Sequence, residues 1–248
     1  MKKILTLLAV AAMVAVACDK DNDNNGSSDN AQIAIDGDFA DWAALDASKV
    51  VVAKNAEGSP WEAVKEIRVY ADKKFVYYYI KFDGETLRDI LAESKGLPMR
   101  ICLNTDGEFE SGYDLYFKEH YDFIIEGELV DDNKEWTSFD GTFYQRLPKD
   151  DGTGTKWKSL LESGNGIASG AGKDNEYEIA LSREVFNANA TNSVEPKLIG
   201  DTFQTGLRFY YIVDDEDETW TELSNMPNLS IDESENGWGH LLEITTNK

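Results

Sequence analysis

Histidine is nearly absent from this sequence, which has only His120 and His240 in 248 residues. Neither histidine has a second ligand at the spacing of a zinc site, so a structural or catalytic zinc ion has little support. The chain also lacks a GxSxG elbow, a phosphate-binding loop and a dinucleotide fingerprint. These absences leave the hydrolases, NTPases and dehydrogenases that carry those motifs without support.

Basic residues are scarce as well. The 24 lysines and arginines face 47 aspartates and glutamates, which gives a formal net charge of -23 at pH 7. Such a body repels nucleic acid and anionic surfaces, so we expect no nucleic-acid partner. Neutral ligands are compatible with this charge, and acidity is also a common way to keep a secreted protein soluble.

Long hydrophobic runs are missing except at the start, "MKKILTLLAVAAMVAVAC". The apolar run is shorter than the roughly 20 residues that a membrane-spanning helix needs, so residues 1–17 are predicted to be a signal peptide. "AVAC" resembles a bacterial lipobox, which implies that Cys18 becomes the acylated N-terminus and holds the protein on a membrane. The alternative is an ordinary signal peptide with a chance cysteine. Cys102 is the only other cysteine, so an intramolecular disulfide is excluded in the mature chain.

Apolar side chains are absent from the stretch that follows Cys18, "DKDNDNNGSSDN". Residues 18–30 are therefore predicted to be an acylated cysteine and a flexible acidic tether. An acidic run directly after the lipid-bearing cysteine is similar to the export signal of surface lipoproteins in the Bacteroidetes phylum. This resemblance implies a lipid anchor in the outer membrane and exposure at the cell surface.

Residues 31–248 are predicted to form one all-β domain, because no linker-like break or fixed repeat divides them. Alternation with period two recurs: in the predicted hairpin over 67–82, Val76, Tyr78 and Ile80 share a face. Only the segment 85–96 has helical spacing. We expect a single antiparallel β-sandwich, jelly-roll-like, with one short helix. Further strands are predicted at 50–53, 99–104, 113–117, 121–127, 141–147, 175–181, 206–213 and 240–244.

Five segments in this order resemble family 9 carbohydrate-binding modules: "IDGDFADW", "VKEIRVYADKKFVYYYIKF", "LNTDGEFESGYD", "NEYEIALSREVF" and "GWGHLLEI". The resemblance implies a β-sandwich that binds sugars, although Ser182 stands where the family often has proline. No sugar-contacting residue is carried over from the family. In the first segment we expect Ile35 to end a strand, Asp36 and Gly37 to form a turn, and Trp42 to fold back onto the open end of the sandwich as a core residue.

Sugars are bound by stacking on aromatic rings while polar side chains contact their hydroxyl groups. Polar, turn-rich neighbours make four tryptophans candidate ligand-binding residues: Trp136, Trp157, Trp220 and Trp61. The polar partners inferred from nearness in sequence are Arg208, Asn225, Glu222 and Asp140. The alternative for any one tryptophan is that it covers a sheet edge or end.

The acidic segment 104–114 holds oxygen-bearing side chains at a density typical of calcium loops. The candidate metal ligands are Asn104, Asp106, Glu108 and Asp114, and family 9 modules often carry structural calcium. The alternative is a solvated hairpin turn built on Asp106 and Gly107.

The sequence as a whole predicts a non-catalytic surface lipoprotein that captures neutral poly- or oligosaccharide for an outer-membrane uptake or degradation system. The alternatives are a structural lipoprotein that uses its aromatic residues to bind a protein partner and, with less support, a glycoside hydrolase. A glycosidase needs two facing carboxylates, and among 47 acids the sequence does not mark a pair.

Overall fold

The computed structural model describes residues 33–108, 113–115, 119–148, 152, 155–191, 193, 197–213, 218–234 and 236–247. The predicted signal peptide, Cys18 and the tether lie outside the described residues. From Ala31 to Lys248 the chain forms one compact unit.

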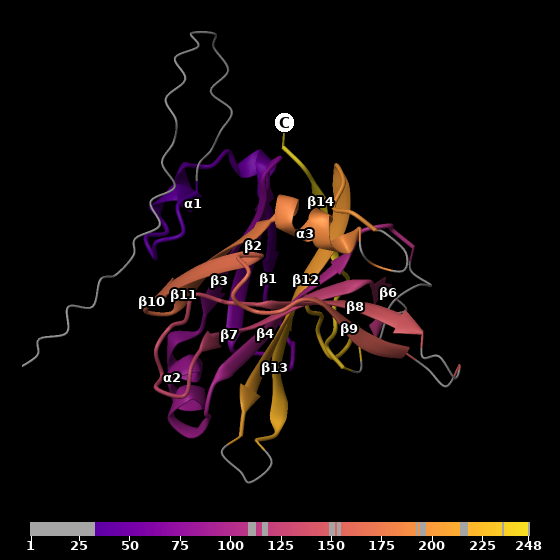
Figure 1. Ribbon diagram of the computed structural model, residues 1–248. Coiled ribbons are helices and arrows are strands. Elements are labelled where there is room, and N and C mark those ends of the chain that lie inside the picture. The colour runs from indigo at the N-terminus through magenta and orange to yellow at the C-terminus, as the bar shows by residue number, and fades with distance from the viewer. Residues whose placement is uncertain are drawn as a thin grey trace, which may run out of the picture. The chain divides into compact units, whose positions relative to one another are not determined.

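Two antiparallel sheets make up the body of the protein (Figure 1), which confirms the predicted all-β sandwich. The five-stranded sheet runs in the order β1 (Val51–Lys54), β2 (Val64–Ala71), β3 (Phe75–Phe82), β11 (Glu176–Ser182), β10 (Ala168–Lys173). The seven-stranded sheet runs in the order β13 (Trp220–Met226), β12 (Thr202–Ile212), β4 (Leu97–Asn104), β7 (Phe123–Val130), β8 (Thr142–Pro148), β9 (Thr155–Leu161), and β14 (Leu242–Thr245) also pairs with β12. Two short strands, β5 (Tyr113–Leu115) and β6 (Glu119–Tyr121), pair with each other.

The predicted helix is α2 (Gly84–Glu93), which begins after Asp83, whose side chain accepts a hydrogen bond from the Thr86 backbone N–H. The structure adds α1 (Ala40–Ala44), a 3-10 turn (Ala47–Lys49) and α3 (Arg183–Ala190). Ser182 caps α3 by accepting a hydrogen bond from the Val185 N–H. A serine in this position therefore starts a helix that the sequence pattern did not predict.

The prediction of a first strand ending at Ile35 is wrong, because residues 33–35 pair with no strand. Four strands, β6, β9, β10 and β13, were not predicted. In β10 the sequence "ASGAGK" has no large side chains to alternate. Its glycines are needed where rings lie on the strand: a Cβ at Gly172 would lie 2.4 Å from the Trp136 ring, and one at Gly170 would lie 2.5 Å from the Tyr177 hydroxyl.

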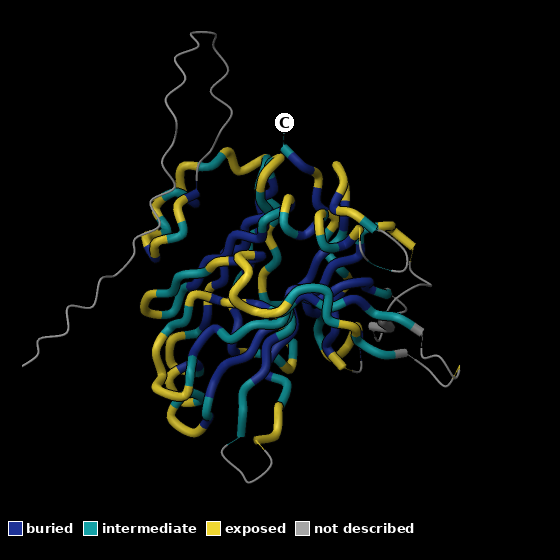
Figure 2. Tube along the Cα trace, viewed as in Figure 1, coloured by how far each residue is buried: buried dark blue, intermediate teal, exposed yellow. Residues whose placement is uncertain are grey.

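The main core lies between the two sheets and takes alternate residues from the central strands, such as Leu97, Met99, Ile101 and Leu103 of β4. The dark blue segments of Figure 2 show that buried residues gather along the strands of both sheets. Val76, Tyr78 and Ile80 of β3 enter it, which confirms the predicted apolar face of the hairpin. The Tyr78 hydroxyl lies 3.0 Å from Thr205 Oγ1 of the opposite sheet. Because Tyr78 is fully buried, this hydrogen bond supplies the partner that its hydroxyl requires.

The N-terminal segment covers the other face of the five-stranded sheet and builds a second, smaller core. Trp42 is 4% exposed in it, which confirms the predicted burial, but it lies on this face of the five-stranded sheet rather than at the open end of the sandwich. The fully buried Glu178 of β11 accepts hydrogen bonds from the backbone N–H groups of Asp36 and Gly37, both at 2.9 Å, and from Trp42 Nε1 at 3.1 Å. Gly37 has φ of +78°, a conformation that favours glycine.

Candidate functional site

The candidate site is the outer face of the seven-stranded sheet, the face that points away from the main core. Along β4, Met99 and Ile101 enter the core, so Arg100 between them points outward. Along β12, Leu207 and Phe209 enter the core, so Arg208 and Tyr210 point outward. Arg100 and Arg208 thus stand in the middle of largely apolar strands and point to this face.

Strand register sets five residues directly opposite one another across this face: Asn225, Arg208, Arg100, Glu126 and Thr142. They come from β13, β12, β4, β7 and β8, five neighbouring strands about 4.8 Å apart. We call this set the cross-strand row. Its members are buried or half-buried, so their polar groups are held in place.

Ion pairs fix the two arginines of the cross-strand row. Arg100 Nε lies 2.6 Å from Glu126 Oε2, and Arg208 Nη2 lies 3.0 Å from Glu222 Oε1. The four side chains are between 12% and 27% exposed, so solvent screens these pairs less than it screens pairs on an open surface. Each arginine of the cross-strand row thus has its own negative partner.

Aromatic rings lie against these arginines at the β13 end of the face. The Arg100 guanidinium lies 4.9 Å from the centre of the Tyr210 ring and 5.5 Å from that of Trp220. The rings of Tyr210 and Trp220 are 5.6 Å apart. Trp220 is 41% exposed and is the most exposed aromatic side chain in the described part of the protein. It therefore offers solvent a ring that is held in position from one side.

A second aromatic group lies toward β9. Trp157 stacks on Tyr121 with ring centres 6.1 Å apart, and the Arg146 guanidinium lies 4.9 Å from the Trp157 ring. Tyr144 of β8 is half-buried in the same cluster. The Tyr121 hydroxyl accepts a hydrogen bond from Arg208 Nη1 at 3.3 Å, which connects this group to the cross-strand row.

Two buried polar atoms of the row have no hydrogen-bond partner among the described residues, Arg208 Nε and Asn225 Oδ1. Both residues line a cavity of about 10 Å³, enough for about one water molecule. Buried donors and acceptors left unpaired by the protein usually bind an ordered water or a ligand atom. The cross-strand row therefore contains one hydrogen-bond donor and one acceptor that no described protein group satisfies.

Burial also sets the ionisation of the face. It raises the pKa of the Cys102 thiol to about 11, although Arg208 and Arg100 act against this shift. It raises the pKa of Tyr210 to about 12 and that of Glu222 above its usual value, with Arg208 opposing both shifts. The thiol is therefore protonated near neutral pH and is a poor nucleophile.

The structure brings together two of the four predicted tryptophans and three of their predicted polar partners. Trp157 and Trp220, with Arg208, Asn225 and Glu222, all belong to the outer face described above. Both tryptophans lie in strands rather than in the loops that their polar neighbours indicated.

The other candidates lie elsewhere. Trp136 packs against the main core, with its ring 5.2 Å from Tyr177 and 6.0 Å from Phe82, instead of lying in an exposed loop. Trp61 is half-buried beside Gly237, and the Asp140 carboxylate accepts a hydrogen bond from the Gly164 backbone. Arg100, Tyr210 and Tyr144 were missed. All three lie in strands that the sequence did predict, and their outward positions in those strands could have identified them.

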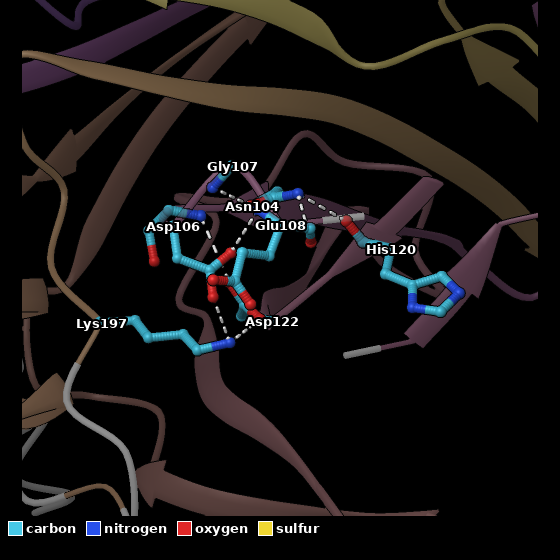
Figure 3. A network of polar contacts seen from close by, with 8 residues as sticks. Asn104, Asp106, Gly107, Glu108, His120, Asp122 and Lys197 are labelled. Carbon is cyan, nitrogen blue, oxygen red and sulfur yellow. Dashed lines mark hydrogen bonds and ion pairs between the residues drawn. The ribbon is translucent and has the colours of Figure 1, made fainter. Parts of the chain in front are cut away.

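The predicted calcium segment is organised by hydrogen bonds and a lysine (Figure 3). Lys197 Nζ lies between two carboxylates, 2.6 Å from Asp106 and 2.7 Å from Asp122. Asn104 accepts a hydrogen bond from the Gly107 N–H at 2.9 Å and donates one to the His120 carbonyl at 3.0 Å.

Burial raises the pKa of Asp122, and the ammonium of Lys197 opposes this shift. Glu108 offers its backbone carbonyl to the Asn104 amide at 3.4 Å, and the Asp114 side chain lies outside the described residues. In the described part of the chain, no three or more histidine, cysteine, aspartate or glutamate side chains are grouped to hold a metal ion. Calcium binding stays a prediction.

Two hollows of the surface flank α2. One, of about 790 Å³, is lined by residues that include Leu87, Arg88 and Lys134, and no aromatic ring lines it. The other, of about 640 Å³, is lined mainly by acidic and small residues, with Tyr211 as its one ring. Both are open and shallow, so we place the candidate site on the outer face, where rings and fixed polar groups converge.

No family model matches the chain, and no curated protein matches it. Within the described ranges, no helix has the length and hydropathy to cross a membrane.

Proposed function

We propose that this protein is a non-catalytic lipoprotein that binds neutral carbohydrate at the cell surface. The observation that carries the proposal is the combination of an exposed ring, Trp220, with the half-buried Arg100–Glu126 pair beside it. The resemblance to family 9 carbohydrate-binding modules agrees with this function.

The chemistry of the outer face suits a polyol. A pyranose ring has an apolar face that stacks on an aromatic ring, and Trp220 and Trp157 are such rings on one sheet face. Hydroxyl groups both donate and accept hydrogen bonds, and each arginine–glutamate pair presents a fixed donor next to a fixed acceptor. Because these side chains are already held by one another, little conformational entropy is lost when a ligand binds.

Charge favours a neutral ligand. A glutamate neutralises each of the two arginines of the cross-strand row. The two ion pairs therefore carry no net charge that would attract an anionic ligand. The net charge of -23 repels nucleic acid and acidic polymers over longer distances.

The location follows from the N-terminus. Acylation of Cys18 and the acidic tether of residues 19–30 would hold the domain outside the outer membrane, where it captures glycan for a neighbouring uptake or degradation system. The membrane contact of the protein is then the lipid on Cys18 alone.

A protein partner is the second candidate, because tryptophan, tyrosine and arginine are also the residues that dominate protein interfaces. The same face would then bury Trp220 and Tyr210 against the partner.

Titration calorimetry with neutral oligosaccharides tests the proposal. We expect saturable binding that weakens about tenfold or more in Trp220→Ala, because the stacking surface is lost. The control is Val52→Ala, since Val52 is also exposed and apolar but lies on β1 of the other sheet. If no neutral glycan binds, the protein-partner candidate takes its place.

A further inference from the structure

We infer that the bound glycan is an extended chain that lies across the strands and is recognised along its interior rather than at its end. This inference rests on the proposed function and adds the form of the ligand. It follows from the direction of the polar and aromatic groups on the outer face.

These groups run from one edge strand of the sheet to the other. Trp220 lies on β13, Arg100 and Glu126 lie in the middle on β4 and β7, and Trp157 lies on β9. Five strand spacings of about 4.8 Å separate β13 from β9, so the groups span at least about 24 Å. A monosaccharide or disaccharide covers only part of that length.

The two ring groups lie on opposite sides of the cross-strand row. Trp220 pairs with Ile212, beyond Arg208 in the direction of the β12 C-terminus. Trp157 pairs with Arg146, which follows Thr142 along β8, and this β8 direction is opposite to that of the β12 C-terminus. A ligand that touches both rings therefore crosses the row diagonally, with Arg100 and Glu126 beneath its middle.

Both ends of this path are edge strands of the sheet. β13 and β9 are the edge strands, and within the described residues no further strand pairs beyond either of them. The enclosed space described on this face is the cavity of about 10 Å³ beside Arg208 and Asn225, which is far too small for a terminal sugar ring. Recognition of a chain end needs a pocket that surrounds it, so the open path favours internal units.

The experiment compares ligand lengths and ligand ends on the purified full-length protein. Cello-, xylo-, manno- and malto-oligosaccharides, from disaccharide to octasaccharide, are titrated by calorimetry. Members of the series that bind are then reduced with borohydride, which opens the ring at the reducing end and leaves the internal units intact.

We expect affinity to rise about tenfold or more from the disaccharide to the longer members, and to change less than about twofold on reduction. Trp220→Ala and Trp157→Ala should each weaken binding of the octasaccharide about tenfold, while Val52→Ala should not. Melting temperatures of all variants, together with Trp220→Phe and Trp157→Phe, which keep a ring, separate lost stacking from lost folding.

Two results would overturn the inference in distinguishable ways. If a disaccharide binds as tightly as an octasaccharide and reduction abolishes its binding, the protein recognises chain ends and only the inference fails. If no saccharide of any length binds, the proposed function fails with it.

Discussion

The indole N–H of Trp42 donates a hydrogen bond of 3.1 Å to the carboxylate of Glu178, on a strand far away in the sequence. The same carboxylate holds the Asp36–Gly37 turn through two backbone N–H groups. The segment "IDGDFADW" thus folds onto β11 because one buried acid accepts three hydrogen bonds from it. This explains why a turn and a tryptophan occur together at the start of the domain.

Removing either partner of this bond should destabilise the protein. We expect Trp42→Phe and Glu178→Gln each to lower the free energy of unfolding by about 1–3 kcal/mol, since each leaves a buried polar group without its partner. The double variant should cost about 1 kcal/mol less than the sum, because both changes remove the same bond. Urea denaturation of the four proteins measures this coupling, and strictly additive losses would contradict the bond's role.

Glu178 should also give the stability a pH dependence. Burial raises its pKa above the ordinary value of 4.5, and the N–H donors of Gly37, Asp36 and Trp42 oppose the shift. The folded state then binds the proton more tightly than the unfolded state does, so the contribution is complete below 4.5 and is lost as pH rises through the folded pKa.

We therefore expect the wild type to lose stability relative to Glu178→Gln as pH rises through that window. Urea midpoints of both proteins across the acidic range test this. A difference between the two proteins that is independent of pH would show that the carboxyl group titrates alike in both states.

Lys197 should contribute more to the stability of the protein than its position in a loop indicates. Its ammonium is the positive partner of Asp122, whose side chain is only 4% exposed. Lys197→Met leaves that carboxylate buried and unpaired, so we expect a loss of about 3 kcal/mol in the free energy of unfolding. Lys54→Met is the control, because the Lys54 side chain is 75% exposed and its pair with Glu66 is long at 3.9 Å, so the change should be below about 1 kcal/mol.

The calcium prediction can be tested on the same loop. A calcium site at Asn104, Asp106, Glu108 and Asp114 predicts that the melting temperature rises with added calcium, falls with EDTA and loses this response in Asp106→Asn. An unchanged melting temperature would contradict the calcium prediction and leave Lys197 as the cation that balances the carboxylates of this loop.

The sequence predicts the parts of the fold that depend on local alternation. The hairpin of β2 and β3 follows from period two and from the aromatic residues of "FVYYYIKF". Alternation does not predict β10, because its glycines are explained only by the rings of Tyr177 and Trp136 that lie on them. Likewise, the polar neighbours of Trp136 conceal that its ring reaches the core between the sheets.

Only some residues of the candidate site could be predicted from the sequence. Trp220 and Trp157 were found from their surroundings, and Arg208 and Glu222 from nearness in sequence. That Arg100 stands directly opposite Arg208 depends on β4 and β12 being neighbours, and this is a property of the sheet order. No local pattern contains it, because the two strands lie far apart in the chain.

Cys102 should be unreactive in the folded protein. It is 1% exposed, and burial raises its pKa to about 11. We expect almost no alkylation by iodoacetamide at about pH 8 in buffer and rapid alkylation in urea, where the thiol regains an ordinary pKa. Cys102→Ser provides the blank. Rapid alkylation in buffer would mean that the outer face opens near β4.

Arg100→Lys provides the sharpest test of the outer face, because the other sheet contains a close counterpart. Arg68 Nε lies 2.6 Å from Glu66 and its guanidinium lies 4.9 Å from the Tyr79 ring, the same two distances that Arg100 has to Glu126 and Tyr210. Lysine keeps the charge at either position but loses the planar group that stacks on the ring.

Both variants should therefore lose similar stability, of about 1 kcal/mol. Only Arg100→Lys should weaken glycan binding, by about tenfold, because only Arg100 lies beside the exposed ring of Trp220. Calorimetric titration and thermal melting of the two variants separate these effects. Equal affinities in Arg100→Lys and Arg68→Lys would move the binding site away from the cross-strand row.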